Sequence, residues 1–420
     1  MVTMHLVLLV SSLLVFLGII LSKFTSRIGA PTLLAFLTIG LLFGNGGKYD
    51  FTYDYPALTL NIGQLALCLI LFSGGLNTDF KHIRPVIFTG LTLSTLGVLL
   101  STFIIGFLTH QLLGLNWLSS LLLGAIVSST DAAAVFSIIE AKKLRLRENI
   151  SPTLEFESGT NDPMAYFLTT ALVAYIGSGS SDWVSLAPWF LYSMVVGGLV
   201  GSVMGYAAVR IMKLIKLNTG QNPVLLLAVV FFTFASCELM GANSLLAVYV
   251  AGIVFGNLRM NISYLGNYFQ GLSWLMEILL FTTLGLQIFI QDLPGVFGWG
   301  LIVSVLVMFV ARPLSVAVCL LFSRNSFKKY IYIAWGGLKG ATPIVFALIP
   351  LIAQLPDAKM IFNITFYVVL SSILGQGLSL GWLAEKLKLN EKTTNKSASK
   401  PSSSPHPAQN TISETSSLIV

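Results

Sequence analysis

Ser158, Asn161 and Asp162 bring a hydroxyl, an amide oxygen and a carboxylate together just before the apolar run LTTALVAYIG. Offsets of three and four residues place these side chains on one face of a helix. Hard oxygen donors of this kind suit a small dehydrated cation, and the carboxylate of Asp162 can take a proton instead. A carboxylate for which a cation and a proton compete is a sufficient device for ion exchange. The alternative is that Asp162 is a paired, structural charge.

Further charged residues lie in apolar surroundings, where an isolated charge costs roughly 2.5–3.5 kcal/mol. Glu157 and Arg312 both fall within apolar runs. Buried charges are usually paired, so we expect a structural Glu157–Arg312 ion pair, with Lys339 as the alternative partner of Glu157.

Other acidic residues leave two interpretations open. Glu155 either lines a funnel toward the site or lies at the membrane interface, and Glu238 and Glu277 have either gating or packing roles. Pro163 follows Asp162 directly and predicts a break in its helix, which is tolerated only beside a cavity or packed helices.

Two apolar segments carry helix-breaking residues next to a charge. In SSTDAAAVF, Asp131 follows Ser128, Ser129 and Thr130, and in GGLKGATPIVF, Lys339 lies among glycines and before a proline. Ser and Thr side chains bond to backbone groups and support a local break in a helix. Two such broken helices would expose helix ends, with Asp131 stabilised near an N-terminal end and Lys339 near a C-terminal end.

The composition is that of a membrane protein. The 420 residues are 55% hydrophobic and 10% charged, with a mean hydropathy of +0.84, whereas soluble domains carry about 25% charged residues. Apolar runs of about 20 residues recur along the chain, as helices that span a bilayer require, and the alternating pattern of a membrane barrel is absent. The three cysteines lie far apart in apolar runs and predict neither a disulfide nor a metal site. The net charge of +7 comes from loops and tail and predicts no nucleic-acid binding.

We expect an all-α polytopic membrane protein with about 13 transmembrane helices. The first segment lacks the positively charged N-terminal region and the small-residue cleavage site of a signal peptide. We therefore predict a transmembrane helix there that is not cleaved off. The predicted spans are 4–22, 31–44, 60–76, 85–109, 117–137, 155–176, 187–211, 222–239, 243–257, 271–290, 296–322, 328–353 and 360–384.

The basic residues predict the orientation. Of the 24 Lys and Arg residues, Arg312 and Lys339 lie inside spans, Lys48 and Lys359 lie in loops on one side, and the other 20 lie on the opposite side. The positive-inside rule then places the N-terminus outside and the C-terminus in the cytoplasm.

A weak internal repeat predicts the domain organisation. FLTIGLLFGN (36–45) resembles YVAGIVFGN (249–257), and TDAAAVF (130–136) lies over GATPIVF (340–346) at an offset of about 210. Chance similarity of Gly-rich apolar segments is the alternative. Two inverted six-helix repeats, about 4–176 and 222–384 around a connector span 187–211, are typical of alternating-access transporters. The transmembrane domain thus covers 1–388, and the polar segment 389–420 is predicted to be a disordered cytoplasmic tail.

Five motifs in this order resemble the monovalent cation/proton antiporter-1 family, in particular its bacterial NhaP-type exchangers: SSTDAAAVF, LEFESGTNDPMA, LLAVYVAGIVFGN, FVARPLSV and GGLKGATPI. The resemblance covers about residues 10–385. It implies a homodimer in which a core domain moves against a dimerisation domain. It also implies that the aspartate of the Asn161-Asp162 pair binds the exchanging ion, and that this Asn-Asp pair goes with electroneutral exchange. Thr130, Asp131, Glu157 and Arg312 match other functional positions of the family.

Three features depart from the family pattern. Ser73 in LFSGGL stands where many relatives have an acidic residue, which puts an accessory carboxylate at that position in doubt. Lys339 replaces the usual arginine, and a lysine keeps the charge without the bidentate fork. Similar potassium/proton exchangers carry ligand-sensing domains after the membrane part, whereas this sequence shows a short tail there, and we do not predict nucleotide-type regulation.

The sequence therefore predicts a secondary active transporter, not an enzyme, that exchanges Na+ or K+ for H+ in the bacterial inner membrane without a cofactor. Asp162 would bind the cation or the proton, with Asn161, Ser158, Thr130 and Asp131 around it. The sequence leaves open which cation is transported, with a slight preference for K+. The alternative functions are a sodium-coupled organic solute symporter of related fold and a passive channel.

Overall fold

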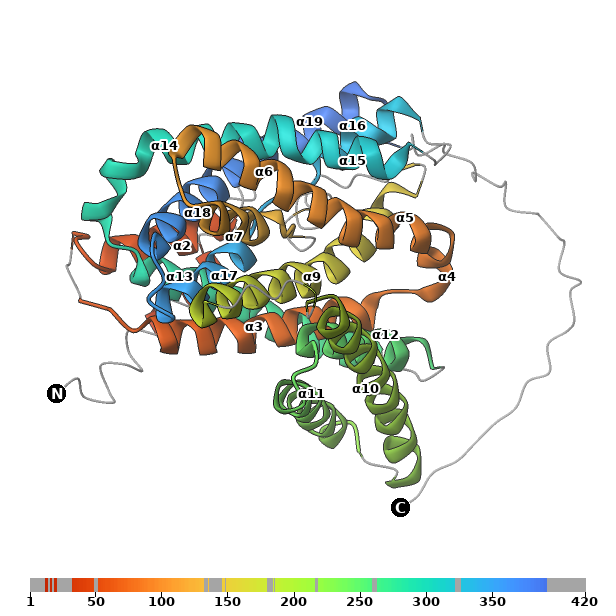
Figure 1. Cartoon of the computed structure of the whole chain (residues 1–420). Coiled ribbons are helices and arrows are strands. Elements are labelled where there is room, and N and C mark those ends of the chain that lie inside the picture. Colours follow the sequence, from red (N-terminus) through yellow and green to blue (C-terminus); the bar gives the residue numbers. More distant parts are fainter. Residues whose placement is uncertain are drawn as a thin grey trace, which may run out of the picture.

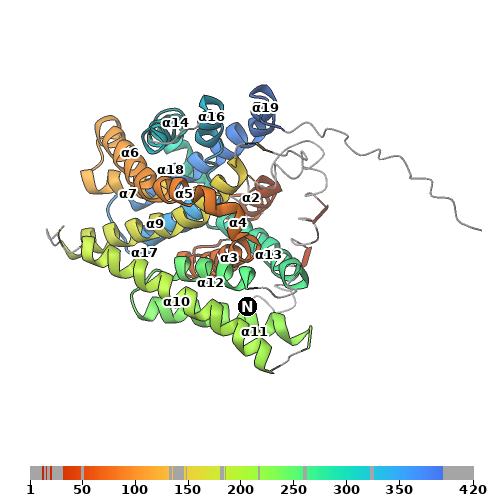
Figure 2. The ribbon, with the colours of Figure 1, turned by 90° about the vertical axis from the view of Figure 1, so that its right-hand side faces the viewer.

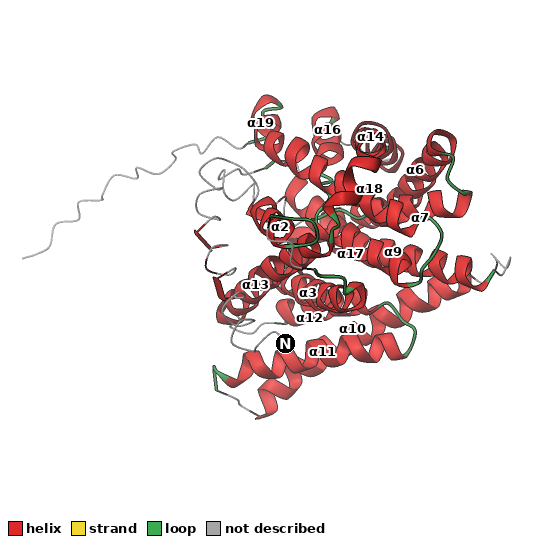
Figure 3. Ribbon diagram, turned by 90° about the vertical axis from the view of Figure 1, so that its left-hand side faces the viewer, coloured by secondary structure: helices red, strands yellow, loops and turns green. Residues whose placement is uncertain are grey.

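The computed structural model describes residues 32–48, 52–131, 149–179, 186–215, 218–258, 263–321 and 326–390, with a few isolated positions between these ranges. Within them the chain is helical and contains no strand (Figure 3). Most of the first predicted span, most of the second half of the fifth, and the tail from residue 391 lie outside the described residues.

The first half of the described chain contains the second to seventh predicted spans. The helices are α2 (Thr32–Phe43), α3 (Pro56–Asn77), α4 (Phe80–Ile83), α5 (Ile87–Thr92), α6 (Val98–Leu113), α7 (Trp117–Ser128), α9 (Ile150–Ser178) and α10 (Leu186–Ile215). α4, α5 and α6 form one long span, which a π-helical turn at Leu93–Gly97 interrupts.

The second half contains the remaining predicted spans. The helices are α11 (Gln221–Leu239), α12 (Ser244–Asn257), α13 (Ser263–Gln287), α14 (Leu293–Leu306), α15 (Arg312–Leu320), α16 (Phe327–Trp335), α17 (Ala341–Ile352), α18 (Ala358–Ser372) and α19 (Leu378–Lys386). π-helical turns at Val307–Ala311 and Ile373–Gly377 join α14 to α15 and α18 to α19. α13 begins eight residues before the predicted start of its span, because its first two turns are too polar to register as apolar sequence.

Seven helical segments of the described chain are long and apolar enough to cross a membrane, and four shorter helices are also apolar. This is expected of a chain in lipid, where every backbone polar group must be bonded internally. α9 is 29 residues long but is not among the seven, and it carries Glu155, Glu157 and Asp162. The chain is thus a multi-pass membrane protein whose most polar long helix is buried among the others.

The predicted break at Pro163 is wrong, because α9 continues without interruption through this proline. A proline removes one backbone hydrogen bond from a helix, and neighbouring side chains can satisfy the backbone around it. The side-chain amide of Asn243, at the N-terminus of α12, donates to the carbonyl of Pro163 itself at 2.7 Å and ties this part of α9 to α12.

The two predicted breaks next to charged residues are present. α7 ends at Ser128 and is followed by the extended residues 129–131, while residues 336–340 separate α16 from α17. The two non-helical segments meet, because the N–H of Asp131 donates to the carbonyl of Leu338 at 2.8 Å. Beyond Asp131, the continuation of the fifth span is described at Val135 alone, which is helical.

The described helices form two groups (Figures 1 and 2). The first group comprises α2, α3 and α10–α13, and one buried apolar cluster joins α3 and α10–α13. The second group comprises α4–α7, α9 and α14–α19. In Figure 2, α9 and α17 lie between α6 and α7 above them and α12 and α10 below them, while α10 and α11 form the outer edge.

Glycines allow helices of the first group to touch backbone to backbone. A Cβ on Gly252 of α12 would lie 2.6 Å from the carbonyl oxygen of Phe72 in α3, and one on Gly75 would overlap the carbonyl oxygen of Tyr249. Gly40 of α2 and Gly285 of α13 meet in the same way. Small residues at such crossings let membrane helices pack closely.

We predict that Gly75→Ala destabilises the protein by ~1–3 kcal/mol, because the added methyl group forces α3 away from α12. The adjacent Gly74 is a matched control, since a Cβ there meets no atom within 4 Å. Gly74→Ala should leave the thermal unfolding of the detergent-solubilised protein unchanged or slightly raised. Equal unfolding temperatures for the two variants would contradict the packing argument.

Candidate ion-binding site

One stripe of α9 lines a cavity of about 530 Å³ between the two helix groups. The stripe consists of Glu155, Ser158, Gly159 and Asp162, at the offsets of three, four and seven that one helical face presents. The opposite wall comes from α3 and α13 of the first group. The cavity reaches Asn77, at the end of α3 that the basic residues predict to be cytoplasmic.

The carboxylate of Asp162 lies where the broken helices cross. Its Oδ1 accepts a hydrogen bond from Ser129 Oγ at 2.5 Å, and its Oδ2 accepts one from Thr342 Oγ1 at 3.3 Å. Ser129 directly follows α7, and Thr342 lies in the first turn of α17. Asp162 is 6% exposed and lines the cavity, so two neutral hydroxyls hold a carboxylate at the cavity wall.

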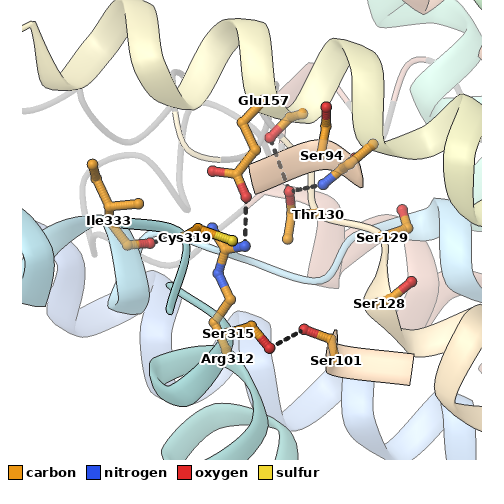
Figure 4. Close-up of polar contacts among 12 residues, drawn as sticks. Ser94, Ser101, Ser128, Ser129, Thr130, Glu157, Arg312, Ser315, Cys319 and Ile333 are labelled. Atoms are coloured by element: carbon orange, nitrogen blue, oxygen red, sulfur yellow. Dashed lines mark hydrogen bonds and ion pairs between the residues drawn. The ribbon is translucent and has the colours of Figure 1, made fainter. Parts of the chain in front are cut away.

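Asn161 lies beside Asp162 but is not among the residues that line the cavity. Its side-chain amide donates to the hydroxyl of Thr130, which also bonds Ser158 Oγ at 3.0 Å. Thr130 is labelled with both contacts in Figure 4. The amide oxygen of Asn161 is buried without a hydrogen-bond partner. The structure therefore places Ser158 and Asp162 on the cavity wall, while Asn161 fixes Thr130 behind it.

Asp131 and Lys339 lie at the helix ends that the sequence predicts for them. A Cβ on Gly340, the N-cap of α17, would overlap the Asp131 carboxylate, so this acid packs directly against a helix N-terminus. Lys339 Nζ donates to the carbonyl oxygens of Ser128 and Ser129, at 3.0 and 2.9 Å, at the C-terminal end of α7. An anion at an N-terminus and a cation at a C-terminus are both stabilised by the helix dipole.

The expected ion pair between Glu157 and Arg312 is present, with Arg312 Nη1 at 2.5 Å from Glu157 Oε1 (Figure 4). Both side chains are buried, at 0% and 5% exposure. Arg312 Nη2 also donates to the carbonyl of Ile333 at 3.4 Å. The alternative pairing of Glu157 with Lys339 does not occur, because the Lys339 ammonium group bonds to the backbone of α7.

The remaining acids of the spans fall in different places. Glu155 lies on the cavity wall, and its Oε1 accepts a hydrogen bond from Thr78 Oγ1 at 2.6 Å. Glu238 of α11 does not line the cavity and accepts from Ser244 Oγ at 2.5 Å and from the Tyr166 hydroxyl at 3.2 Å. Glu277 of α13 lines the cavity together with Asp162.

Sequence reasoning missed the two hydroxyls that bond Asp162. Ser129 and Thr342 come from helices more than 30 and about 180 positions away along the chain from Asp162. Each stands next to a predicted helix break, which is the signal that could have found them. Ser73 is also on the cavity wall, so a neutral hydroxyl occupies the position where the family pattern has an acid.

No group of three or more His, Cys, Asp or Glu side chains in the described part of the chain lies close enough to hold a metal ion. The three cysteines are buried and unpaired.

Comparison with known proteins agrees with this fold. The chain is 38% identical over 391 residues to the K(+)/H(+) antiporter NhaP of Alkalimonas amylolytica, covering 93% of this chain and 68% of that protein. It is 37% identical over 388 residues to the K(+)/H(+) antiporter NhaP2 of Shewanella sp. (strain MR-4), covering 91% and 67%. It is 30% identical over 340 residues to the Na(+)/H(+) antiporter NhaH of Halobacillus aidingensis, covering 78% and 83%.

The fold is that of the sodium proton antiporter MjNhaP1 from Methanocaldococcus jannaschii, solved at pH 8, with a TM-score of 0.79 at 24% identity over 90% of this chain and 97% of that one. These relatives give no support to a sodium-coupled organic solute symporter. The sequence model of the transmembrane sodium/hydrogen exchanger family matches residues 12–386. The chain therefore belongs to the sodium/hydrogen exchanger family, in agreement with the resemblance found in its motifs.

Proposed function

We propose that this chain exchanges a monovalent cation, Na+ or K+, for H+ across the membrane, with Asp162 binding the two ions in turn. The environment of the Asp162 carboxylate carries the proposal. It faces a cavity, accepts hydrogen bonds from two neutral hydroxyls, and has no ion pair within the described residues. A carboxylate at membrane depth must be neutralised, and a proton or a cation arriving through the cavity can do this.

One-for-one, electroneutral exchange follows from the charges around this site. Glu157 and Arg312 neutralise each other, and Asp131 and Lys339 are held at helix ends. None of these four charges has to change during the cycle. Asp162 then carries either one proton or one monovalent cation. The site therefore has the same net charge when it moves with the proton as when it moves with the cation.

Alternating access requires a path to the other side. A second cavity of about 360 Å³ lies between the same two helix groups, at the opposite ends of α3 and α13. Asp54 and Gln287 line it from the first group, and Lys359 and Asn363 from the second. We infer that the second group is a core domain that moves against the first, a dimerisation domain, so that Asp162 faces one cavity and then the other.

Two inverted repeats would relate the two halves of the chain, and with them the two cavities, by a pseudo-two-fold axis. Gly40 and Gly252 are about 210 residues apart, as are Gly75 and Gly285, and the contact of Gly40 with Gly285 is the counterpart of the contact of Gly252 with Gly75. The broken fifth and twelfth spans, which carry Asp131 and Lys339, stand at the same offset. This agreement supports repeats at about 4–176 and 222–384.

K+ is the cation that we propose as the substrate, because the more similar of the relatives above are named K(+)/H(+) antiporters. The oxygen atoms around Asp162 suit either ion, so Na+ is the competitor to test.

The family resemblance also supports a homodimer in the plasma membrane of a bacterium, with the C-terminus in the cytoplasm. α10 and α11, at the outer edge of the first group, are the proposed location of the dimer contact (Figure 2).

Asp162→Asn should abolish cation-driven proton movement in proteoliposomes that contain a pH-sensitive dye, because asparagine carries no charge and does not take up or release a proton. The wild type should respond to added K+ salts, and Na+ and Li+ salts are tested in parallel. Asp357→Asn is a matched control, since Asp357 is exposed and its left-handed backbone, with φ 63°, suits asparagine. Full cation-coupled proton flux in Asp162→Asn would refute the proposed mechanism.

Glu157→Gln should destabilise the protein by ~3–5 kcal/mol, because it leaves the Arg312 charge buried without a counter-charge. The double variant Glu157→Gln/Arg312→Gln should unfold at a higher temperature than either single variant and should recover part of the transport. A Glu157→Gln variant with wild-type stability but no transport would instead assign Glu157 to the transport cycle.

A further inference from the structure

Glu277 lies deep in the membrane at a level comparable to that of Asp162. α9 and α13 both begin at the predicted cytoplasmic side, and Asp162 and Glu277 lie 12 and 14 residues from their first residues. At 1.5 Å per residue these positions are ~18 and ~21 Å along the two helices. Both side chains line the same cavity, and Asp131 is an electrostatic neighbour of each.

Glu277 differs from the other acids discussed above in having no partner among the described residues. Glu157 has Arg312, Glu155 has Thr78, and Asp162 has two hydroxyls. Glu277 makes no hydrogen bond or ion pair with any residue that the structure describes, and its charged neighbour Asp131 has the same sign. Since a carboxylate at this depth must be neutralised, the proton or cation that neutralises Glu277 reaches it through the cavity that it lines.

A buried hydroxyl also lies on the cavity wall. Tyr249 on α12 is 2% exposed, and its hydroxyl, which lies near Thr78, makes no hydrogen bond of normal geometry. Tyr249 lines the cavity together with Ser73 and Ser273. Carboxylate, hydroxyl and phenol oxygens are the donors that a partly dehydrated monovalent cation requires.

We propose that Glu277 forms a second cation-binding position in this cavity, which holds the monovalent cation opposite Asp162 before the cation reaches it. The proposal rests on the proposed antiport and adds a site to it. Glu277 belongs to the first helix group, whereas Asp162 belongs to the second group, which we infer to move. Glu277 therefore does not move with Asp162 during transport. It raises the cation affinity on the predicted cytoplasmic side and does not change the number of protons exchanged per cation.

The test measures the dependence of proton flux on K+ and Na+ concentration in proteoliposomes, with the cation added on the predicted cytoplasmic side. Glu277→Gln should raise KM for the cation about tenfold, the factor that ~1.4 kcal/mol produces, while kcat and the exchange ratio stay near wild type. Glu238→Gln is the matched control, because Glu238 does not line the cavity, and its KM should not change.

Moving the carboxylate to another position on the cavity wall distinguishes a role of Glu277 in ion binding from a role in packing. Ser73 lines the same cavity from α3, so Ser73→Glu in the Glu277→Gln background should return KM toward the wild-type value. An unchanged KM in Glu277→Gln would overturn the proposal. So would a loss of kcat and of thermal stability that Ser73→Glu leaves uncorrected, since that result would assign Glu277 a packing role.

A binding measurement on Asp162→Asn distinguishes this proposal from the antiport mechanism and needs no transport. Asp162→Asn protein in detergent should still be stabilised against thermal unfolding by K+ relative to choline. The double variant Asp162→Asn/Glu277→Gln should lose that stabilisation. Absence of any K+ effect in Asp162→Asn would contradict the second position while leaving the role of Asp162 intact. Full transport by Asp162→Asn would instead refute the antiport mechanism itself.

Discussion

The crossing of two broken helices is the constraint on which the rest of the site depends. Residues 129–131 and 336–340 are non-helical inside the membrane, and the bond from Asp131 N–H to the Leu338 carbonyl joins them. Non-helical backbone at this depth leaves polar groups that must be satisfied. Lys339 satisfies two carbonyls at the end of α7, and the Asp131 carboxylate packs on the start of α17. The same breaks bring Ser129 and Thr342 to Asp162.

The distribution of charge around the crossing separates fixed charges from an exchangeable one. The fixed charges are bonded to the protein, as in the Glu157–Arg312 pair and in the contact of Lys339 with α7. Asp162 is bonded to hydroxyls, which can donate to a carboxylate or accept from a protonated one. A hydroxyl environment tolerates both states of the acid, whereas an ion pair would favour the charged state. This difference makes Asp162 suitable for exchange and Glu157 suitable for holding α9 to α15.

Much of the fold followed from the sequence because lipid imposes simple rules. Apolar runs located most of the described spans within a few residues, α13 being the exception, and glycines, a lysine and a proline located the break before α17. The charge of Arg312 in an apolar run predicted its partner, because an unpaired charge there would be prohibitive.

What failed depended on neighbours distant in sequence. Pro163 predicts a break from local chemistry alone, but α9 continues through it among packed helices, where Asn243 of α12 bonds the Pro163 carbonyl. The bond from the Asn161 amide to Thr130 joins two helices and could not be read from either motif alone. The position of Glu277 on the cavity wall depends on how α13 packs against α3, which one sequence does not reveal.

The central claim is that a cation and a proton compete for the carboxylate of Asp162. The most direct measurement is the proton release when K+ or Na+ is added to the purified protein in weakly buffered detergent solution. Competition predicts that the wild type releases a proton when a cation binds at Asp162, and that Asp162→Asn releases one proton fewer per protein molecule. Cation binding without proton release in the wild type, or equal release from Asp162→Asn, would contradict the claim.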